Sequence, residues 1–304
     1  MNTAADSQAA KARRYRRGLL HAGAAYLIWS ANPLYFALLA GVPAMEITAH
    51  RAWWSVPTIV LLLAAAGRLH ETVRTLASAR LLGWLALSGV FIGLNWWLFV
   101  HGLETRRTLE MSLGYYIYPL LSVAAAWLFL GERFSARQAA AVGLMVLAVA
   151  WLMLSTGSAP WLALALGGSF TIYGLLRRHI VVGALEGLLV EAVLLSAAFA
   201  AWAIAGGEAT HFGKDAWNTT FLLLAGPVTV APLAFYAAAA RRIRFSTLGL
   251  MFYVIPTSFF LTAIFVFGEP FDMNRFIAFA IIWAALIIYA ADSRRQAARE
   301  SAGG

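Results

Sequence analysis

The sequence predicts an all-α integral membrane protein with ten transmembrane helices, arranged as two inverted five-helix repeats. Apolar residues make up 62% of the 304 residues and charged residues only 12%, about half the charged share of a typical soluble domain. The apolar residues fall into ten segments of about membrane-spanning length. The second five segments repeat features of the first five.

The ten segments follow one another with short connections, so no inserted soluble domain is expected. Their approximate bounds are 18–40, 45–67, 81–103, 109–131, 136–155, 160–177, 183–205, 219–240, 246–268 and 273–291. The first segment is too long for the core of a signal peptide and is expected to stay as a helix. The predicted organisation is a basic cytoplasmic tail over 1–17, a first repeat over 18–155, a second over 160–292 and a cytoplasmic tail over 293–304.

The repeat is clearest in the fourth and ninth segments. Leu113–Pro119 leads to Gly131-Glu132, and Leu250–Pro256 leads to Gly268-Glu269, with aromatic residues just before each proline. In both copies the Gly-Glu pair follows the proline by the same distance. Because five is an odd number, a copied five-helix unit would enter the membrane upside down, which is how many secondary transporters are built.

The positive charge is expected to set the topology. The net charge is +9, and most of the 23 Lys and Arg residues fall on the same side as the N-terminus, Arg177 and Arg178 among them. This bias predicts that both termini are cytoplasmic. It argues against nucleic acid as a partner, and the lipid bilayer is the expected surrounding. There is no cysteine, so a thiolate metal site is excluded.

Several polar residues lie inside the apolar segments, where a charge costs about 2.5–3.5 kcal/mol at the centre of a helix. Asn32, Arg51 and Asn95 fall at a similar depth on three segments and predict the wall of a polar cavity. The alternative is that Arg51 reaches outward to water and the asparagines only bond between helices. Glu191 lies close to the midplane. We hypothesise that it pairs directly with Arg51, taken as the only cation available within the spans.

Aromatic residues share helix faces with these polar groups. Trp29 lies on the face of Asn32, and tyrosines of the fourth segment match Phe252 and Tyr253 in the ninth. Lining a pocket is favoured over packing alone, because a tyrosine hydroxyl near the core needs a partner. The candidate substrate-binding residues are Trp29, Asn32, Tyr35, Arg51, Trp54, Asn95, Trp96, Tyr115, Tyr116, Tyr118, Tyr173, Glu191, Tyr236, Phe252 and Tyr253.

A second group of residues is a candidate for coupling or gating. Glu46 and His50 share a helix face and could bind a proton, or a metal with other ligands, although Glu46 could simply face water. Glu132 and Glu269 follow glycines at helix ends, where they are either solvated helix stops or braces of a gate. Pro119 and Pro256 each free a backbone carbonyl, which is tolerated where helices line a cavity or are covered by neighbours. No catalytic, metal or cofactor-binding residues are assigned.

The chain resembles the RarD branch of the EamA-type transporters, in the drug/metabolite transporter superfamily. The resemblance covers roughly residues 18–292. It rests on Ala25–Trp29 with Asn32–Phe36, Glu46–Arg51, Gly93–Trp96, Ser112–Leu120, Leu130–Phe134 and Ser246–Gly249. It implies ten helices in two EamA repeats, a location in the bacterial inner membrane, and export or exchange of small metabolites or drugs.

The function we expect is secondary transport of a small polar, zwitterionic or aromatic solute by alternating access. There is no nucleotide-binding loop, so gradients and not ATP would drive transport. Protons are a candidate coupling ion, and uniport and exchange stay open. Two alternatives stay open. One is an intramembrane enzyme acting on a lipid, with His50, His101 or Glu104 as its acid or base. The other is a receptor or channel that does not transport. The oligomeric state is open as well.

Overall fold

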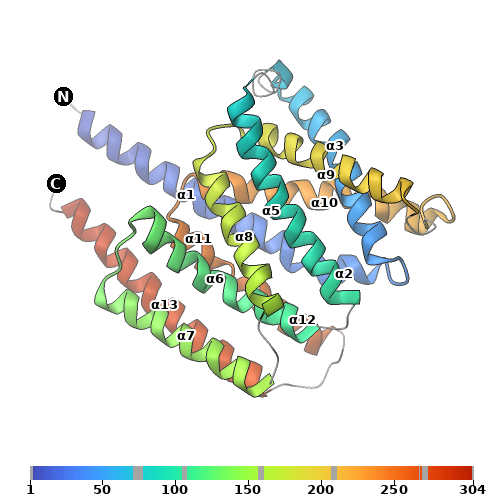
Figure 1. Ribbon diagram of the computed structural model, residues 1–304. Coiled ribbons are helices and arrows are strands. Elements are labelled where there is room, and N and C mark those ends of the chain that lie inside the picture. Colours follow the sequence, from blue (N-terminus) through green and yellow to red (C-terminus); the bar gives the residue numbers. More distant parts are fainter. Residues whose placement is uncertain are drawn as a thin grey trace. The chain divides into compact units, whose positions relative to one another are not determined.

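The computed structural model consists of helices joined by short turns over the residues that it describes (Figure 1), which are 3–70, 78–104, 108–156, 161–206, 211–266, 268 and 273–302. The helices are α1 Thr3–Ser30, α2 Asn32–Ala37, α3 Ala44–Ala65, α5 Ala79–Glu104, α6 Thr108–Leu130, α7 Ala136–Thr156, α8 Trp161–His179, α9 Ala184–Ile204, α10 Ala216–Ala240, α11 Phe245–Met251, α12 Val254–Phe265 and α13 Met273–Ala302.

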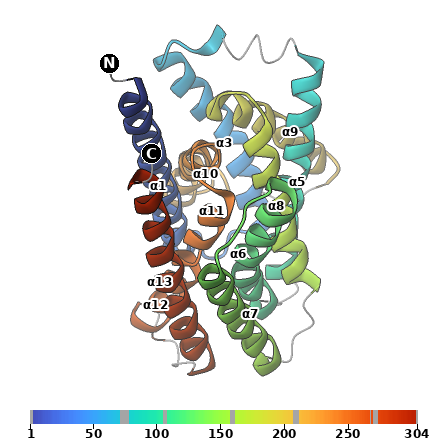
Figure 2. The same cartoon turned by 90° about the vertical axis from the view of Figure 1, so that its left-hand side faces the viewer.

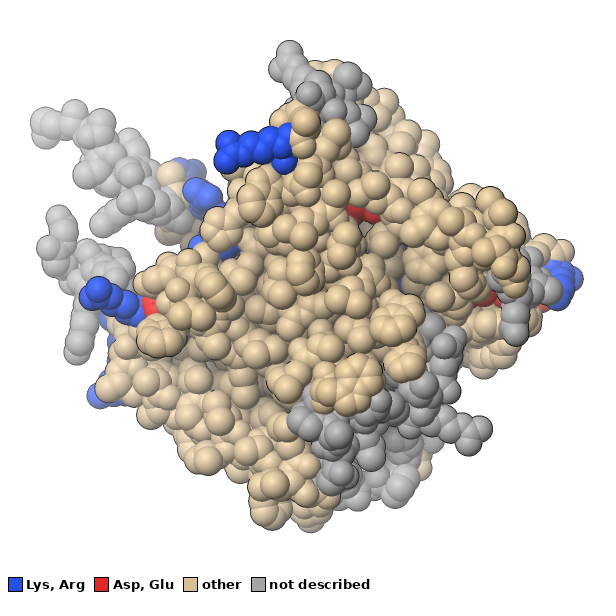
Figure 3. Space-filling view, viewed as in Figure 1, with Lys and Arg blue, Asp and Glu red and all other residues tan. Residues whose placement is uncertain are grey.

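Two of the predicted spans are bent. The first divides into α1 and α2 after Ser30, and the ninth divides into α11 and α12. With each pair counted once, the described residues hold ten helices. Six stretches are long and apolar enough to cross a bilayer, namely Ala79–Phe99, Ala136–Ser155, Ala184–Ile204, Ala216–Ala240, Phe245–Thr262 and Phe276–Ser293. On the face in Figure 3, uncharged residues cover most of the described surface, as expected for an all-helical membrane protein.

The chain divides into two compact units that each combine segments from both predicted repeats. Unit 1 comprises Met1–Arg106 and Ser169–Ile243, and unit 2 comprises Arg107–Gly168 and Arg244–Gly304. The boundary therefore falls inside α8. Compactness follows the packing partners of each helix and not the order of the chain, so these units differ from the division between residues 155 and 160.

Unit 1 is built around α3 and α10. Helix α10 packs against α1 and α3, and α9 packs against α3 and α5. Gly226 on α10 lies against the backbone of Trp54 on α3, so closely that a Cβ atom at residue 226 would overlap it. The absence of a side chain there allows the two helices to approach each other. Trp53 Nε1 donates to the Ser196 carbonyl (3.2 Å) between α3 and α9.

In unit 2, α7 runs antiparallel to α13. At the start of α7, Ser135 Oγ donates to Asp292 Oδ2 (2.5 Å) and Gln138 Nε2 donates to Ser293 Oγ (3.0 Å), near the end of α13. Figure 2 shows α7 beside α6 in the same unit. The apolar core of these helices includes Tyr116, Met145, Leu152, Tyr253, Phe279 and Ile282.

Helix α6 also runs antiparallel to the α11–α12 pair. The end of α6 meets the start of α11, where Glu132 accepts from the Phe245 amide (2.8 Å). Farther back along α6, Tyr115 packs on Phe252 and Phe259. Gly249 has no side chain that would overlap Ser122 of α6.

The two prolines behave differently. Pro119 lies inside α6 without ending it, whereas the break between α11 and α12 falls at Phe252 and Tyr253, just before Pro256. Proline has no N–H and cannot donate to the carbonyl four residues earlier, here that of Phe252. The Ile255 amide donates to the Phe252 carbonyl instead (2.9 Å), over three residues.

Candidate functional site

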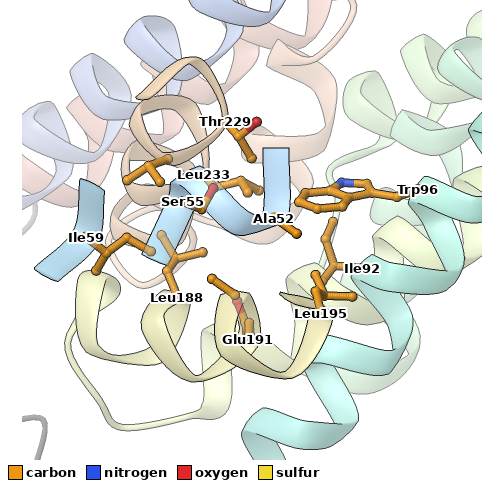
Figure 4. A pocket seen from close by; sticks show the side chains of 12 residues that line it. Ala52, Ser55, Ile59, Ile92, Trp96, Leu188, Glu191, Leu195, Thr229 and Leu233 are labelled. Carbon is orange, nitrogen blue, oxygen red and sulfur yellow. The ribbon is translucent and has the colours of Figure 1, made fainter. Parts of the chain in front are cut away.

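A small pocket lies inside unit 1, between α3, α5, α9 and α10 (Figure 4). Its wall is mostly aliphatic, with the carboxylate of Glu191 and the hydroxyls of Ser55 and Thr229. The centre of a water-sized molecule can reach about 20 Å³ inside it, roughly the room of one water. In this structure the pocket is therefore too small for a solute much larger than water. It is lined by Ala52, Ser55, Ile59, Ile92, Trp96, Leu188, Glu191, Ala192, Leu195, Thr229, Val230 and Leu233.

Glu191 brings a negative charge to this wall although the residue is only 2% exposed. Ser88 of α5 donates to one carboxylate oxygen, and the Tyr173 hydroxyl of α8 donates to the other (3.4 Å). The guanidinium of Arg177 lies 3.5 Å from the carboxylate. An opposite charge with additional hydrogen bonds offsets the cost of removing Glu191 from water.

Arg177 is the partner that the sequence analysis missed. Its apolar segment ends there, where a cation is expected in water, but the residue is 2% exposed. Gly187 of α9 leaves room for its guanidinium, and Arg177 Nη2 donates to the Ala184 carbonyl (3.0 Å). The hypothesis of a direct Arg51–Glu191 pair is wrong, because the cation beside Glu191 is Arg177.

Arg51 is held beside the same pocket from α3. Its Nε donates to Thr229 Oγ1 (2.9 Å), and its guanidinium lies 4.7 Å from the ring centre of Trp96 and 5.9 Å from that of Phe36. Two of these partners, Thr229 and Trp96, line the pocket. An aromatic face attracts a guanidinium electrostatically, and this attraction is stronger where the cation has lost water. These contacts hold Arg51 against residues of the wall, but Asn32, Arg51 and Asn95, the three residues predicted to form a polar wall, do not themselves line this pocket.

An aromatic cluster lies next to this charged region. Trp29 packs edge-on against Phe170 (5.7 Å between ring centres), and its ring is tilted against that of Tyr236 (5.8 Å). Phe170 also stacks on Tyr173, which reaches Glu191. The structure therefore brings Trp29, Tyr173 and Tyr236 together with Glu191, as residues of one connected group.

Three further candidates in unit 1 contact neighbouring helices. Asn95 Nδ2 donates to Ser169 Oγ (3.1 Å), which is the interhelical bond of the alternative interpretation. The Tyr35 hydroxyl donates to the Phe221 carbonyl (2.7 Å). Asn32 opens α2, directly after the break that follows α1, and is half-buried.

Glu46 and His50 belong to a separate cluster at the start of α3. The Glu46 carboxylate, 4% exposed, accepts from the backbone amides of His211 and Phe212 and from His211 Nδ1 (2.9 Å). The idea that Glu46 simply faces water is therefore wrong. Trp54 Nε1 donates to His50 Nδ1 (3.0 Å), and Phe212 stacks on the His50 ring.

The remaining aromatic candidates lie together in unit 2. Tyr115 stacks on Phe252 (5.9 Å between ring centres), and Tyr118 meets Phe252 edge-on (4.4 Å). The Tyr253 hydroxyl donates to the Tyr116 carbonyl (3.1 Å). Tyr116 and Tyr253 belong to the apolar core of the unit, so their part in binding stays a prediction.

Glu132 joins two helices of unit 2. Its carboxylate accepts from the Phe245 amide, the Ser246 hydroxyl and Arg244 Nε (3.1 Å), at the first turn of α11. A carboxylate there also complements the helix dipole. Glu132 is thus bonded to protein groups and is not a solvated helix stop. Its predicted counterpart, Glu269, lies outside the described residues.

Comparison with known proteins gives consistent matches. A model of the EamA-like transporter family matches residues 16–154. The protein RarD from Salmonella typhi is 41% identical over 285 residues, covering 93% of this chain and 97% of its own length. The protein RarD from Escherichia coli strain K12 is 40% identical, covering 93% of this chain and 96% of its own length.

Two more distant matches extend this. A Pseudomonas aeruginosa protein described as "Chloramphenicol-sensitive protein RarD" is 31% identical over 285 residues, covering 92% of this chain and 95% of its own. One solved crystal structure of a protein is 21% identical, with a TM-score of 0.71, and the match covers 91% of this chain and 98% of that one. At that identity the match shows a shared fold.

Proposed function

Since the chain belongs to the EamA-like transporter family, among its RarD proteins, we propose that it moves a small polar or zwitterionic solute across the bacterial inner membrane by alternating access. Membership makes it a membrane transporter and not an enzyme. The alternative of a lipid-modifying activity is thereby set aside. The proposal adds the mechanism, the topology and the site.

Two packing relations support alternating access by inverted repeats. Helix α6 is antiparallel to α11–α12, and α7 is antiparallel to α13, as expected if the fourth and ninth spans, and the fifth and tenth, are inverted copies. We assign both termini to the cytoplasm from the distribution of Lys and Arg. The side of the membrane opposite the termini is called outer below.

The observation that carries the proposed substrate class is the pair of opposite charges at the pocket. Glu191 lies in the wall, and Arg51 bonds to Thr229 of the same wall. A solute with an ammonium and a carboxylate group could meet both charges. The nearby aromatic cluster of Trp29, Tyr173 and Tyr236 could pack on an apolar part of the solute. Protons are the candidate coupling ion, with Glu191 or His50 as the binding group.

The test is solute counterflow by the purified protein in liposomes, with a panel of amino acids, amines and amphenicols. Amphenicols are included because the name of one relative refers to chloramphenicol. We expect at least one solute to exchange, and we expect Arg51→Gln and Glu191→Gln each to reduce that exchange at least tenfold. Arg137→Gln is the matched control, because its side chain is 63% exposed in unit 2.

Counterflow that persists in both pocket variants would contradict the site, and no counterflow with any solute would contradict the substrate class. Proton coupling is measured in the same liposomes. An imposed pH gradient should change the rate of the wild type and leave that of Glu191→Gln or of His50→Gln unchanged. If both variants respond like the wild type, neither residue is the proton-binding group.

A further inference from the structure

The start of α9 repeats the start of α3. Helix α3 opens with Ala44-Met45-Glu46 and α9 with Ala184-Leu185-Glu186, so each has a glutamate at its third position. Five residues farther on, α3 carries Arg51 and α9 carries Glu191. The two charges at the pocket are thus equivalent positions of the two repeats. The two glutamates at the helix starts are equivalent as well.

The two helices run antiparallel, so these glutamates lie at opposite ends of the pair. Trp53 of α3 bonds to Ser196 of α9, whereas Arg68, just beyond the end of α3, reaches Glu186 at the start of α9. Glu46 therefore belongs to the outer end, by the assigned topology, and Glu186 to the cytoplasmic end. The pocket lies between them, because Ser55 and Leu188 both line it.

At the outer end, Glu46 holds the segment that follows α9. Its carboxylate accepts three hydrogen bonds, from two backbone amides and the ring of His211. Phe212 is thereby placed on the rings of His50 (4.9 Å between centres) and Trp54 (5.8 Å). We call Glu46, His211 and Phe212 the outer latch.

At the cytoplasmic end, Glu186 holds the segment that follows α3. Arg68 Nη2 lies 2.8 Å from its carboxylate, and that carboxylate is 1% exposed while Arg68 is 42% exposed. Gly67 has a φ of +64° just after the end of α3, a conformation that often terminates helices. The next amide, that of Arg68, donates back to the Leu63 carbonyl (2.8 Å). Gly183 leaves room for the carboxylate where a Cβ atom would collide with it. We call Glu186 and Arg68 the inner latch.

Each glutamate therefore joins the start of its own helix to the segment that follows the other helix. A carboxylate in the first turn is favourable for any helix, but that effect needs neither burial nor a partner from the opposite repeat. We propose that the two latches are the paired gates of the pocket, the outer one releasing it to the outside and the inner one to the cytoplasm. The contacts of both latches are formed in this structure, in keeping with the small volume of the pocket. The proposal rests on the proposed transport function.

The chain has no cysteine, so a single introduced cysteine can report access to the pocket. Ser55→Cys is nearly isosteric and places the thiol in the pocket wall. Its labelling by a membrane-impermeant maleimide is measured in right-side-out and inside-out vesicles. In this background, Glu46→Gln should raise labelling several-fold from the outer side only. Glu186→Gln should raise it several-fold from the cytoplasmic side only.

The partner residues give a second, milder pair of variants, because both are partly exposed. His211→Ala should act like Glu46→Gln but more weakly, since the backbone amides still reach Glu46. Arg68→Ala should act like Glu186→Gln. Arg137→Gln is the control, because this exposed side chain lies in unit 2 and belongs to neither latch. It should leave labelling unchanged from both sides.

The proposal would be overturned if the outer-latch and inner-latch variants raised the labelling of Ser55→Cys from the same side. It would also be overturned if all four variants lowered thermal stability and left the labelling unchanged, and the glutamates would then be helix caps. The labelling needs no substrate. It therefore fails or succeeds independently of the counterflow assay, and the two proposals can be told apart.

Discussion

At the scale of single residues, Arg177 and Glu191 form a buried ion pair within unit 1. Both residues are 2% exposed, and their charged groups lie 3.5 Å apart. Removing one partner of such a pair costs about 3–5 kcal/mol because the other charge is left buried and uncompensated, whereas neutralising both can be nearly neutral.

We therefore predict that Arg177→Met lowers stability strongly and that adding Glu191→Gln restores much of it. The measurement is thermal unfolding of the purified single and double variants in detergent. Solute counterflow should stay at least tenfold below that of the wild type in the double variant, because the carboxylate at the pocket is gone. A double variant whose loss equals the sum of the two single losses would contradict the direct pair.

The environment of Arg51 gives a second residue-scale prediction. Arg51→Lys keeps the charge but loses the stacking on Trp96 and the Nε bond to Thr229. Lysine cannot reproduce a planar, forked donor. We expect counterflow of the transported solute to fall about tenfold, equivalent to about 1.4 kcal/mol. The control Arg137→Lys should behave like the wild type, and equal rates for both variants would contradict the assigned role of Arg51.

Charges inside apolar segments could be found from the sequence alone. Arg51 and Glu191 stand out because they interrupt hydrophobic runs, and both lie at or beside the pocket. Arg177 could not be recognised in the same way. It follows the end of its apolar run, and only the packing of α9, with Gly187 opposite, buries it. Thr229 and Ser88 are neutral and common in membrane helices, so their bonds became visible only in the folded structure.

At the scale of helices, close approach depends on a few glycines. Gly226 faces the Trp54 backbone, which cannot move aside as a side chain would, whereas Gly143 on α7 has open space around its Cα. We predict that Gly226→Ala costs about 1–3 kcal/mol through forced separation of α3 and α10. Gly143→Ala should be neutral or stabilising, by up to about 1 kcal/mol, because alanine is the better helix former.

Thermal unfolding of the two purified alanine variants measures this difference. Equal stability of both would show that α3 and α10 are not held at the distance seen here. Counterflow serves as a second readout, and it should be reduced only in the Gly226 variant.

The helices themselves were predictable, and six stretches are long and apolar enough to cross a bilayer. The ends and bends of the helices were less predictable. Apolar windows mark the membrane-facing part, so α1 and α13 extend beyond their predicted bounds into polar sequence rich in alanine and arginine, which are good helix formers. The bend after Ser30 falls just before Pro33, which has no N–H to donate to the Trp29 carbonyl one turn earlier. The break before Pro256 and the continuous α6 at Pro119 show that the same proline motif leads to different backbone outcomes in different surroundings.

At the scale of the whole molecule, each compact unit draws on both predicted repeats. The duplication is predicted from the sequence because motifs recur at fixed spacing. The composition of the units is not, because it depends on which helices pack together. Glu46 is equivalent to Glu186, and Arg51 to Glu191, in the predicted duplication. This equivalence relates the predicted repeats to the packing of unit 1. It places matched residues of the two repeats at opposite ends of one helix pair within unit 1.

The inverted arrangement is the central claim, and single-cysteine labelling of the two Gly-Glu regions tests it most directly. Arg133→Cys and Val266→Cys lie just beyond α6 and at the end of α12, and both residues are exposed. A membrane-impermeant maleimide should label position 133 only from the cytoplasmic side and position 266 only from the outer side. Labelling of both positions from the same side would contradict the inverted repeat and, with it, the proposed mechanism.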